Sequence, residues 1–142
     1  MACIVQPARA GVCHAVYLPC VACVTYASPA MSITVYEKRT CTTCRKLHEL
    51  LTERGIDFDT VQYHVEGLTE PEVRGLLAKA GIPAAEALRM REQGAAELAA
   101  AGDEDAIVAA MAQRPELLQR PIVVNGDRAV LARPVERVLE IL

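Results

Sequence analysis

In the segment TVYEKRTCTTCRKLHELL, residues 34–51, a strand pattern changes into a helix pattern. Apolar and polar side chains alternate through SITVYE, as they do in a short, half-buried strand. Beyond the cysteines, three leucines recur at helical spacing on one face: Leu47, Leu50 and Leu51. Two cysteines three positions apart, Cys41 and Cys44, therefore stand where a strand has ended and a helix begins.

The segments that follow this helix predict further strands. FDTVQY, residues 58–63, is rich in β-forming side chains and is expected to be a second strand. Because a helix connects the two strands, they should lie parallel, joined by a right-handed crossover. Near the C-terminus, Pro121 precedes the runs IVV and AVLA, which an Asn-Gly turn joins into a hairpin. The closing RPVERVLEIL predicts a helix. Its inward-facing residues are expected to be Val135, Val138, Leu139 and Leu142.

Between these two parts, residues 66–118 are expected to form an all-helical insertion. One helix opens on Thr69 as its cap. Pro83 should begin a second helix that runs through AAEALRM, and a third should start at Asp103 and stop before Pro115. The predicted order of elements is therefore βαβ, helices, ββα.

Composition and charge limit the function classes. The chain has 142 residues, 52% of them apolar and 23% charged, which indicates one globular domain. Its net charge is −3 and the two signs are interspersed, so no basic surface for nucleic acid is expected. No apolar run reaches the roughly 18 residues that a membrane helix needs. We expect a monomer with neither nucleic acid nor a membrane as a direct partner.

The first 30 residues differ from the rest of the chain. They contain a single formal charge, Arg9, and four of the six cysteines. We interpret residues 1–30 as a disordered leader, or as the product of an upstream start codon used in place of Met31. A secretory signal and a functional cysteine-rich arm are the alternatives, although Pro19 interrupts the apolar part that a signal needs. The domain is predicted to span residues 31–142.

Cys41 is a candidate nucleophile because of where it stands. Unpaired backbone N–H groups and the dipole at the start of a helix favour a thiolate over a thiol, whose ordinary pKa is about 8.5. Arg39 and Arg45 add positive charge within reach, so activation needs no histidine. Cys44 lies one helical turn further on, near enough to close a disulfide with Cys41. A Cys-x-x-Cys pair after the first strand of a βαβ unit is typical of thioredoxin-like redox proteins.

Zinc binding is the competing interpretation of the cysteines. Cys20 and Cys23 precede Cys41 and Cys44 with 17 residues between the pairs, a spacing found in four-cysteine zinc sites. The first pair, however, lies in the leader, and neither pair has between its cysteines the glycine or basic residue with which zinc knuckles usually turn around the metal. His48 follows Cys44 at helical spacing, which would suit a Cys/His metal pair, but a solvated helix histidine is favoured. We therefore expect no metal.

Four sequence elements occur in order after Met31. They are the strand leading to Cys41 with Arg45 four residues later, ALR at 87–89, QRPIVVN at 119–125 and LARPVERVLEIL at 131–142. Together they are far more specific than any Cys-x-x-Cys pair. Through them, residues 32–142 resemble the ArsC family of thioredoxin-fold arsenate reductases, which also includes the Spx redox regulators. The resemblance implies an α/β, thioredoxin-like fold with a four-stranded mixed sheet.

The resemblance also implies roles for individual residues. In arsenate reductases of this family, a cysteine at the position of Cys41 attacks arsenate and forms a covalent thiol–arsenate intermediate, while arginines hold the oxyanion. By position these substrate-binding residues are Arg89, Arg120 and Arg133, joined by Arg45. Guanidinium groups, each of which can donate hydrogen bonds to two oxygens, would offset the repulsion between arsenate and thiolate. Pro121 corresponds to the cis-proline that faces the active thiol in thioredoxin folds.

The same resemblance implies which thiols supply the electrons. Cys44 is expected to be the resolving thiol. No cofactor should be bound, because a small-molecule thiol with glutaredoxin, or thioredoxin if an internal disulfide forms, would supply the electrons. A cycle that needs reduced thiols implies a cytoplasmic protein.

Two departures from the family pattern keep an alternative open. Reductases commonly have His-Asn-Pro where this chain has Glu37, Lys38 and Arg39, and they usually have serine where Cys44 stands. The Cys41/Cys44 pair is closer to Spx proteins, in which the pair is a disulfide switch and the protein binds RNA polymerase. Spx chains, however, extend beyond the last helix and do not keep the whole arginine set. The alternative function is therefore an Spx-like transcriptional regulator without turnover.

Overall fold

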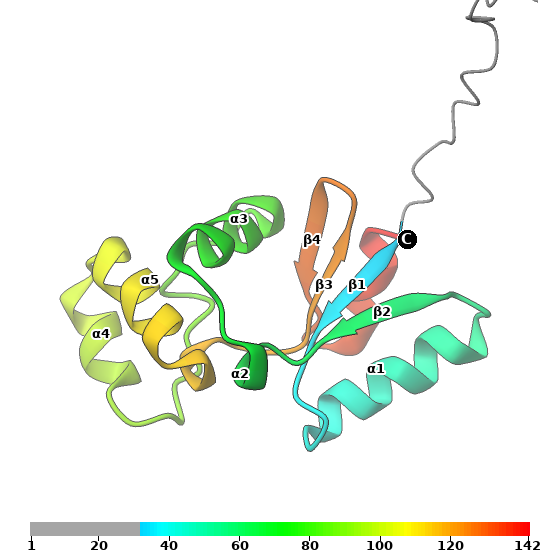
Figure 1. Cartoon of the computed structure of the whole chain (residues 1–142), viewed down its shortest axis with the longest axis horizontal. Coiled ribbons are helices and arrows are strands. Elements are labelled where there is room, and N and C mark those ends of the chain that lie inside the picture. The colour runs from blue at the N-terminus through cyan, green and yellow to red at the C-terminus, as the bar shows by residue number, and fades with distance from the viewer. Residues whose placement is uncertain (1–31) are drawn as a thin grey trace, which may run out of the picture.

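The computed structural model describes residues 32–142, which form a four-stranded mixed sheet with helices on both of its faces (Figure 1). The predictions for residues 1–30, including the leader and a zinc site that uses Cys20 and Cys23, lie outside the described residues. Within residues 32–142, no helix combines the length and the apolar character needed to cross a membrane. In the same part of the chain, no three His, Cys, Asp or Glu side chains gather as they would around a metal ion.

The sheet has the strand order β2-β1-β3-β4. β1 (Ile33–Tyr36) pairs in parallel with β2 (Phe58–Val61) and antiparallel with β3 (Ile122–Asn125), which forms a hairpin with β4 (Arg128–Leu131). The connection from β1 to β2 runs through α1 (Thr42–Glu53), as a parallel pairing requires. The predicted α/β fold with a four-stranded mixed sheet is therefore confirmed.

Two apolar cores lie on opposite faces of this sheet. The other elements are α2 (Tyr63–Glu66), α3 (Glu70–Ala80), α4 (Ala95–Ala101), α5 (Glu104–Gln113) and the 3₁₀ segments η1 (Pro115–Leu117) and η2 (Val135–Glu140). Ile33 and Val35 of β1 point into the core that α1 and η2 cover. Ile122 and Leu131 point into the larger core, which α3, α5 and η1 cover. Figure 1 shows α3, α4 and α5 gathered on the other side of the sheet from α1.

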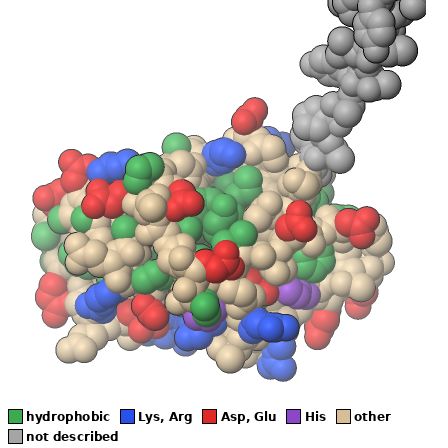
Figure 2. Space-filling view, viewed as in Figure 1, with side chains coloured by type: hydrophobic (Ala, Val, Ile, Leu, Met, Phe, Trp, Pro, Cys, Tyr) green, Lys and Arg blue, Asp and Glu red, His purple; other side chains and the backbone are tan. Residues whose placement is uncertain are grey.

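Charged side chains of both signs are spread over the surface. Figure 2 shows acidic and basic residues interspersed on one face of the molecule, with apolar side chains between them. The large apolar side chains that are exposed are scattered along the chain, at Val65, Met90, Leu139 and Leu142. This face therefore carries no extended field of one sign.

The helix predicted at residues 83–90 is wrong. These residues form turns, and Leu88 pairs with Leu118 in an isolated antiparallel bridge. The backbone N–H groups of Arg89 and Gln119 each donate a hydrogen bond across this bridge, both at 2.8 Å. Because both leucines are buried, pairing with a distant segment outweighs the helix propensity of the alanines.

The C-terminal segment η2 is a 3₁₀ helix, which changes its inward face. A 3₁₀ helix repeats every three residues, so Val135, Val138 and Ile141 share one side and join the core beneath α1. Leu139 and Leu142, predicted to face inward from an α-helical repeat, are instead 39% and 44% exposed.

Candidate active site

Cys41 is the N-cap residue of α1. Its backbone is extended, with φ −82° and ψ 124°. Its N–H donates to the Lys38 carbonyl at 2.8 Å, and its own carbonyl accepts the N–H of Arg45 at 3.1 Å, the first bond of the helix. No side-chain hydrogen bond closes the cap, and the first turn carries no acidic residue. The N–H groups of that turn are therefore available to a negative charge on the Cys41 sulfur.

The surroundings of Cys41 stabilise its thiolate. Burial by itself raises the pKa of this thiol, but the backbone N–H groups of Cys44 and Thr43, the Cys44 thiol and the Arg120 guanidinium lower it. The balance moves the pKa of Cys41 from 9.0 down to about 7. A large fraction of the molecules therefore carries a nucleophilic thiolate at neutral pH.

Cys44 has the opposite character. It is only 1% exposed, and this burial raises its pKa. The Lys38 backbone N–H acts in the other direction, while the nearby Cys41 and Glu37 raise the pKa further, to about 12. Both cysteines are free thiols. At neutral pH the pair therefore consists of a reactive thiolate and a buried, protonated thiol.

Cys41 opens into a pocket of about 330 Å³ whose lining is polar and largely cationic. The lining residues are Lys38, Thr40, Cys41, Thr42, Thr43, Arg89, Arg91, Arg120 and Arg133. The structure thus brings Arg89, Arg120 and Arg133, which come from three separate segments, to one place beside Cys41. Among the described residues that line this pocket, none is acidic.

Sequence reasoning missed two cations of this pocket, Lys38 and Arg91. Each is close in the chain to a residue that was singled out, since Lys38 precedes Cys41 by three positions and Arg91 follows Arg89 by two. Arg91 lies one position beyond the helix expected at residues 83–90, in an alanine-rich stretch whose faces could not be assigned from the sequence. In the turn that is present instead, both arginines face the pocket.

Arg120 is the most enclosed of the pocket arginines, with 5% exposure. Its Nε and Nη1 atoms have no hydrogen-bond partner among residues 32–142. Beside it, the buried Tyr63 donates its hydroxyl to the Leu118 carbonyl at 3.0 Å. Burial raises the pKa of Tyr63, and the positive charge of Arg120 acts against that rise. A buried guanidinium is costly unless an anion pairs with it, so Arg120 indicates an anionic ligand.

Arg89 and Arg133 are both held through their Nε atoms. Arg133 Nε donates to the backbone carbonyl of Arg120 at 2.7 Å. Arg89 Nε lies 2.8 Å from Glu92 Oε1, an ion pair whose geometry is not that of an aligned hydrogen bond. With Nε engaged inside the protein, the terminal amino groups of each guanidinium are left for the pocket.

The two arginine–proline segments lie next to each other. The Arg120–Pro121 peptide bond is cis, and so is Arg133–Pro134, which the sequence did not single out. The Ala132 N–H donates to the Pro121 carbonyl at 3.0 Å. This bond ties the residue before Arg133 to the residue after Arg120, and so places the two guanidinium groups at the same pocket.

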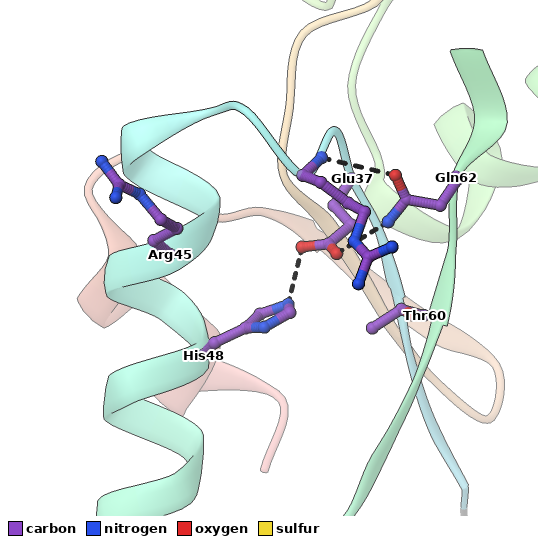
Figure 3. A pocket seen from close by; sticks show the side chains of 6 residues that line it. Glu37, Arg45, His48, Thr60 and Gln62 are labelled. Atoms are coloured by element: carbon purple, nitrogen blue, oxygen red, sulfur yellow. Dashed lines mark hydrogen bonds and ion pairs between the residues drawn. The ribbon is translucent and has the colours of Figure 1, made fainter. Parts of the chain in front are cut away.

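Arg45, expected among the substrate-binding residues, lies elsewhere. It lines a second pocket of about 370 Å³ between α1 and β2. The lining residues there are Glu37, Arg39, Arg45, His48, Thr60 and Gln62, none of which lines the pocket beside Cys41. In Figure 3 the Arg45 side chain projects from the outer side of α1, away from Glu37. The structure therefore does not join Arg45 with the three arginines.

This second pocket contains a buried carboxylate that sequence reasoning also missed. Glu37 is 3% exposed. One of its oxygens accepts a hydrogen bond from Gln62 Nε2 at 3.0 Å, and the other lies 2.6 Å from His48 Nε2 (Figure 3). His48, expected to be solvated, is partly buried against the ring of Phe58. The sequence did contain a signal for the burial of Glu37. Side chains in a strand alternate between its two faces, and Glu37 follows Ile33 and Val35 at steps of two on the inward face.

Comparison with known proteins agrees with this geometry. Residues 36–141 match the model of the ArsC family. An arsenate reductase of Escherichia coli K12 is 35% identical over 114 residues, 78% of this chain and 81% of the relative. YfgD of the same strain, an uncharacterized protein, is 34% identical over 114 residues, 78% of this chain and 96% of YfgD.

Solved structures agree as well. The structure of an arsenate reductase from Vibrio cholerae has a TM-score of 0.73 to this chain at 36% identity, covering 80% of this chain and 99% of that one. The residues that match the family model, 36–141, include Cys41, strands β2, β3 and β4, and all three arginine segments. The predicted family is confirmed: the chain belongs to the ArsC family of thioredoxin-fold proteins.

Proposed function

We propose that this protein is a thiol-dependent oxidoreductase of the arsenate reductase type, in which Cys41 attacks an oxyanion held by Arg89, Arg120 and Arg133. One observation carries this proposal: the three arginines converge with the activated thiol in a single pocket. Curated relatives and a solved structure that are named arsenate reductases support arsenate as the substrate.

The pocket suits a small oxyanion with more than one negative charge. An attacking thiolate and an arsenate dianion repel each other, and fixed positive groups offset that repulsion as the two approach. Arg120 offers buried N–H groups that have no partner among the described residues. Guanidinium groups can engage two oxygens at once and so orient the arsenic toward sulfur. Lys38 and Arg91 add further positive charge.

The reaction proceeds in two steps whose electrons balance. Cys41 thiolate first forms a sulfur–arsenic bond, and one protonated arsenate oxygen leaves as water. Cys44 then loses its proton to the solvent, and its sulfur attacks Cys41 sulfur and forms the disulfide. The sulfur–arsenic bond breaks, and its electron pair reduces As(V) to As(III) while the two thiols are oxidised. Thioredoxin, or a small thiol with glutaredoxin, restores the thiols, so the protein works in the reducing cytoplasm without a bound cofactor.

A redox-switched regulator that binds RNA polymerase is the second candidate. The Cys41/Cys44 pair favours it, since a reversible disulfide at the start of α1 changes charge and shape without any substrate. A regulator has no use for a pocket with several cations around Cys41, which is why the enzyme is preferred.

Turnover separates the two candidates. Full-length protein is mixed with arsenate, thioredoxin or glutaredoxin with its small thiol, and NADPH-linked reductase, and NADPH oxidation is followed. Cys41→Ser should abolish turnover, whereas Cys44→Ser should only slow it, because an external thiol can replace Cys44. Arg120→Ala should lower kcat/KM by about 100-fold. The control Arg54→Ala, at an exposed position beyond the end of α1, should match wild type. No arsenate-dependent oxidation, together with co-purification of polymerase, would favour the regulator.

A further inference from the structure

The proposed reaction needs a proton in the pocket beside Cys41. When the Cys41 sulfur bonds to arsenic, one arsenate oxygen must leave, and it leaves most easily as water. A hydroxyl group of arsenate needs one more proton to become water. A side chain that lines this pocket and can release a proton as the arsenic–oxygen bond breaks would therefore be a catalytic group.

Most residues that line the pocket cannot release a proton at neutral pH. The described lining consists of Cys41, three threonines, four arginines and one lysine. Guanidinium groups keep their protons in proteins, and threonine hydroxyls are not acidic. The Cys41 sulfur reacts as its thiolate and has no proton to give. The remaining side chain is that of Lys38, whose ammonium group carries protons that it can release.

The other titratable side chains close to this pocket are placed differently. His48 and Glu37 contact each other in the second pocket and are absent from the described lining of this one (Figure 3). The buried Tyr63 donates its hydroxyl to a backbone carbonyl at 3.0 Å. The Cys44 thiol is only 1% exposed and does not line the pocket either. In the described part of the chain, Lys38 is therefore the side chain of this pocket that can act as an acid.

The backbone fixes Lys38 close to Cys41. The Cys41 N–H donates to the Lys38 carbonyl at 2.8 Å, which closes a turn immediately before α1. Lys38 is half-buried, and its side chain makes no ion pair with an acidic residue among residues 32–142. Its ammonium group is therefore not neutralised by a carboxylate there and is available to an anion in the pocket.

We propose that Lys38 is the general acid of the first step. The Cys41 sulfur forms a bond to arsenic with its own electron pair, and the bond from arsenic to one hydroxyl oxygen breaks. That oxygen keeps the electron pair of the broken bond, takes a proton from the Lys38 ammonium and leaves as water. The neutral amine then regains a proton from the solvent, and arsenic is still As(V). The inference rests on the proposed function, because it names the proton donor of that reaction.

One substitution separates the charge of Lys38 from its proton. If Lys38 acts only as a positive charge, Lys38→Arg keeps that charge and should react at close to the wild-type rate. If Lys38 donates the proton, Lys38→Arg should be slow, because a guanidinium group keeps its protons. Loss of a general acid typically costs about 100-fold or more in rate.

The first turnover can be followed without an electron donor. Reduced full-length protein is mixed with saturating arsenate, quenched with acid at increasing times, alkylated and digested with trypsin. Trypsin cuts after Arg39 and Arg45, so one short peptide, residues 40–45, contains both Cys41 and Cys44. Mass spectrometry of this peptide gives the fraction of protein that has formed the disulfide at each time.

Lys38→Arg and Lys38→Ala should each slow formation of this disulfide by about 100-fold. Lys46→Arg is the matched control, because Lys46 is exposed on α1 and does not line the pocket, and it should match wild type. Alkylation of Cys41 by iodoacetamide without arsenate should be unchanged in Lys38→Arg, which shows that the site is intact.

Chemical rescue gives a readout that a structural role of Lys38 would not change. Methylammonium can enter the space left in Lys38→Ala and donate the missing proton, so it should raise the rate of this variant by about tenfold. Guanidinium and tetramethylammonium ions carry the same charge but release no proton, and they should not rescue it. Methylammonium should leave the wild-type rate unchanged.

The outcomes distinguish this inference from the proposed function. A wild-type rate in Lys38→Arg would overturn the role of Lys38 alone, and so would rescue of Lys38→Ala by all three cations equally. If Lys38→Arg fails to fold, the rescue of Lys38→Ala decides, and no effect of methylammonium contradicts the inference. Wild-type protein that forms no disulfide with arsenate would overturn the proposed function, and this role of Lys38 with it.

Discussion

Arg133 donates a hydrogen bond of 2.7 Å from its Nε to the backbone carbonyl of Arg120, so two of the three arginines beside Cys41 are fixed to each other. Arg120 precedes β3 and Arg133 follows β4, and the β3–β4 hairpin brings them together. The spacing of the positive charges is therefore set by the sheet.

The Arg133→Lys variant tests whether this arrangement matters for an oxyanion. Lysine keeps the positive charge but has no Nε–H for the Arg120 carbonyl and no planar pair of donors. We expect kcat/KM for arsenate to fall by about 100-fold. Steady-state assays would show this, with Arg54→Lys as the matched change at an exposed position. Equal kinetics in Arg133→Lys and wild type would mean that charge alone is needed.

The thiolate of Cys41 can be titrated by its reactivity. Alkylation by iodoacetamide follows the thiolate fraction, so its rate at Cys41, followed by mass spectrometry, should rise with pH through a midpoint of about 7. Because a hydrogen bond from the Arg120 side chain lowers this pKa, Arg120→Ala should move the midpoint to higher pH. Cys44 should stay unmodified over the same range, since its pKa is about 12. A midpoint near 9.0 for Cys41 would show that the helix terminus and Arg120 do not activate it.

The bridge between Leu88 and Leu118 should affect both stability and substrate binding. Leu88→Ala leaves a cavity in the core and should lower the free energy of unfolding by about 2–5 kcal/mol. Because Arg89 is held by this bridge, the KM for arsenate should also rise. Met90→Ala, at an exposed neighbour, should change stability by less than about 0.5 kcal/mol. Urea unfolding would measure the stability and steady-state kinetics the KM, on the same preparations. An unaltered KM in Leu88→Ala would show that substrate binding by Arg89 does not depend on the bridge.

The cap of α5 offers a change that should spare the active site. The Asp103 side chain accepts the N–H groups of Asp105 and Ala106 at 3.0 and 3.2 Å. Asp103→Ala should cost about 1 kcal/mol of stability, whereas Asp103→Asn, which keeps an acceptor, should cost less. Asp103 does not line the pocket beside Cys41, so kcat/KM should stay the same. Thermal unfolding measures the loss of stability. A lower kcat/KM in folded Asp103→Ala would contradict the expectation that the active site is unaffected.

The sequence predicted correctly those elements that are determined by residues close together in the chain. The alternation in β1, the leucine spacing of α1 and the Asp103 cap each depend on residues within a few positions of one another, and all three are present. The position of Cys41 at a helix start followed from the same patterns. These features could be predicted because neighbouring side chains and backbone groups are enough to fix them.

Features that depend on distant contacts were less predictable. The segment around Leu88 has good helix formers, yet it pairs with Leu118 because both side chains are buried there. The period of two in β1 points Glu37 inward, but its partners Gln62 and His48 come from other elements and could not be predicted from neighbouring residues. That Arg89, Arg120 and Arg133 would share a pocket came from the family resemblance, since no spacing rule within one chain relates them. The same resemblance added Arg45, whose exposed position on α1 takes it away from the others.

A crystal structure of the Cys41→Ser variant soaked with arsenate would show whether the pocket binds the oxyanion. We expect a tetrahedral anion between the residue 41 side chain and the guanidinium groups of Arg89, Arg120 and Arg133, identified by the anomalous scattering of arsenic. Arsenic bound only at surface positions, with those guanidinium groups turned away from residue 41, would contradict this expectation.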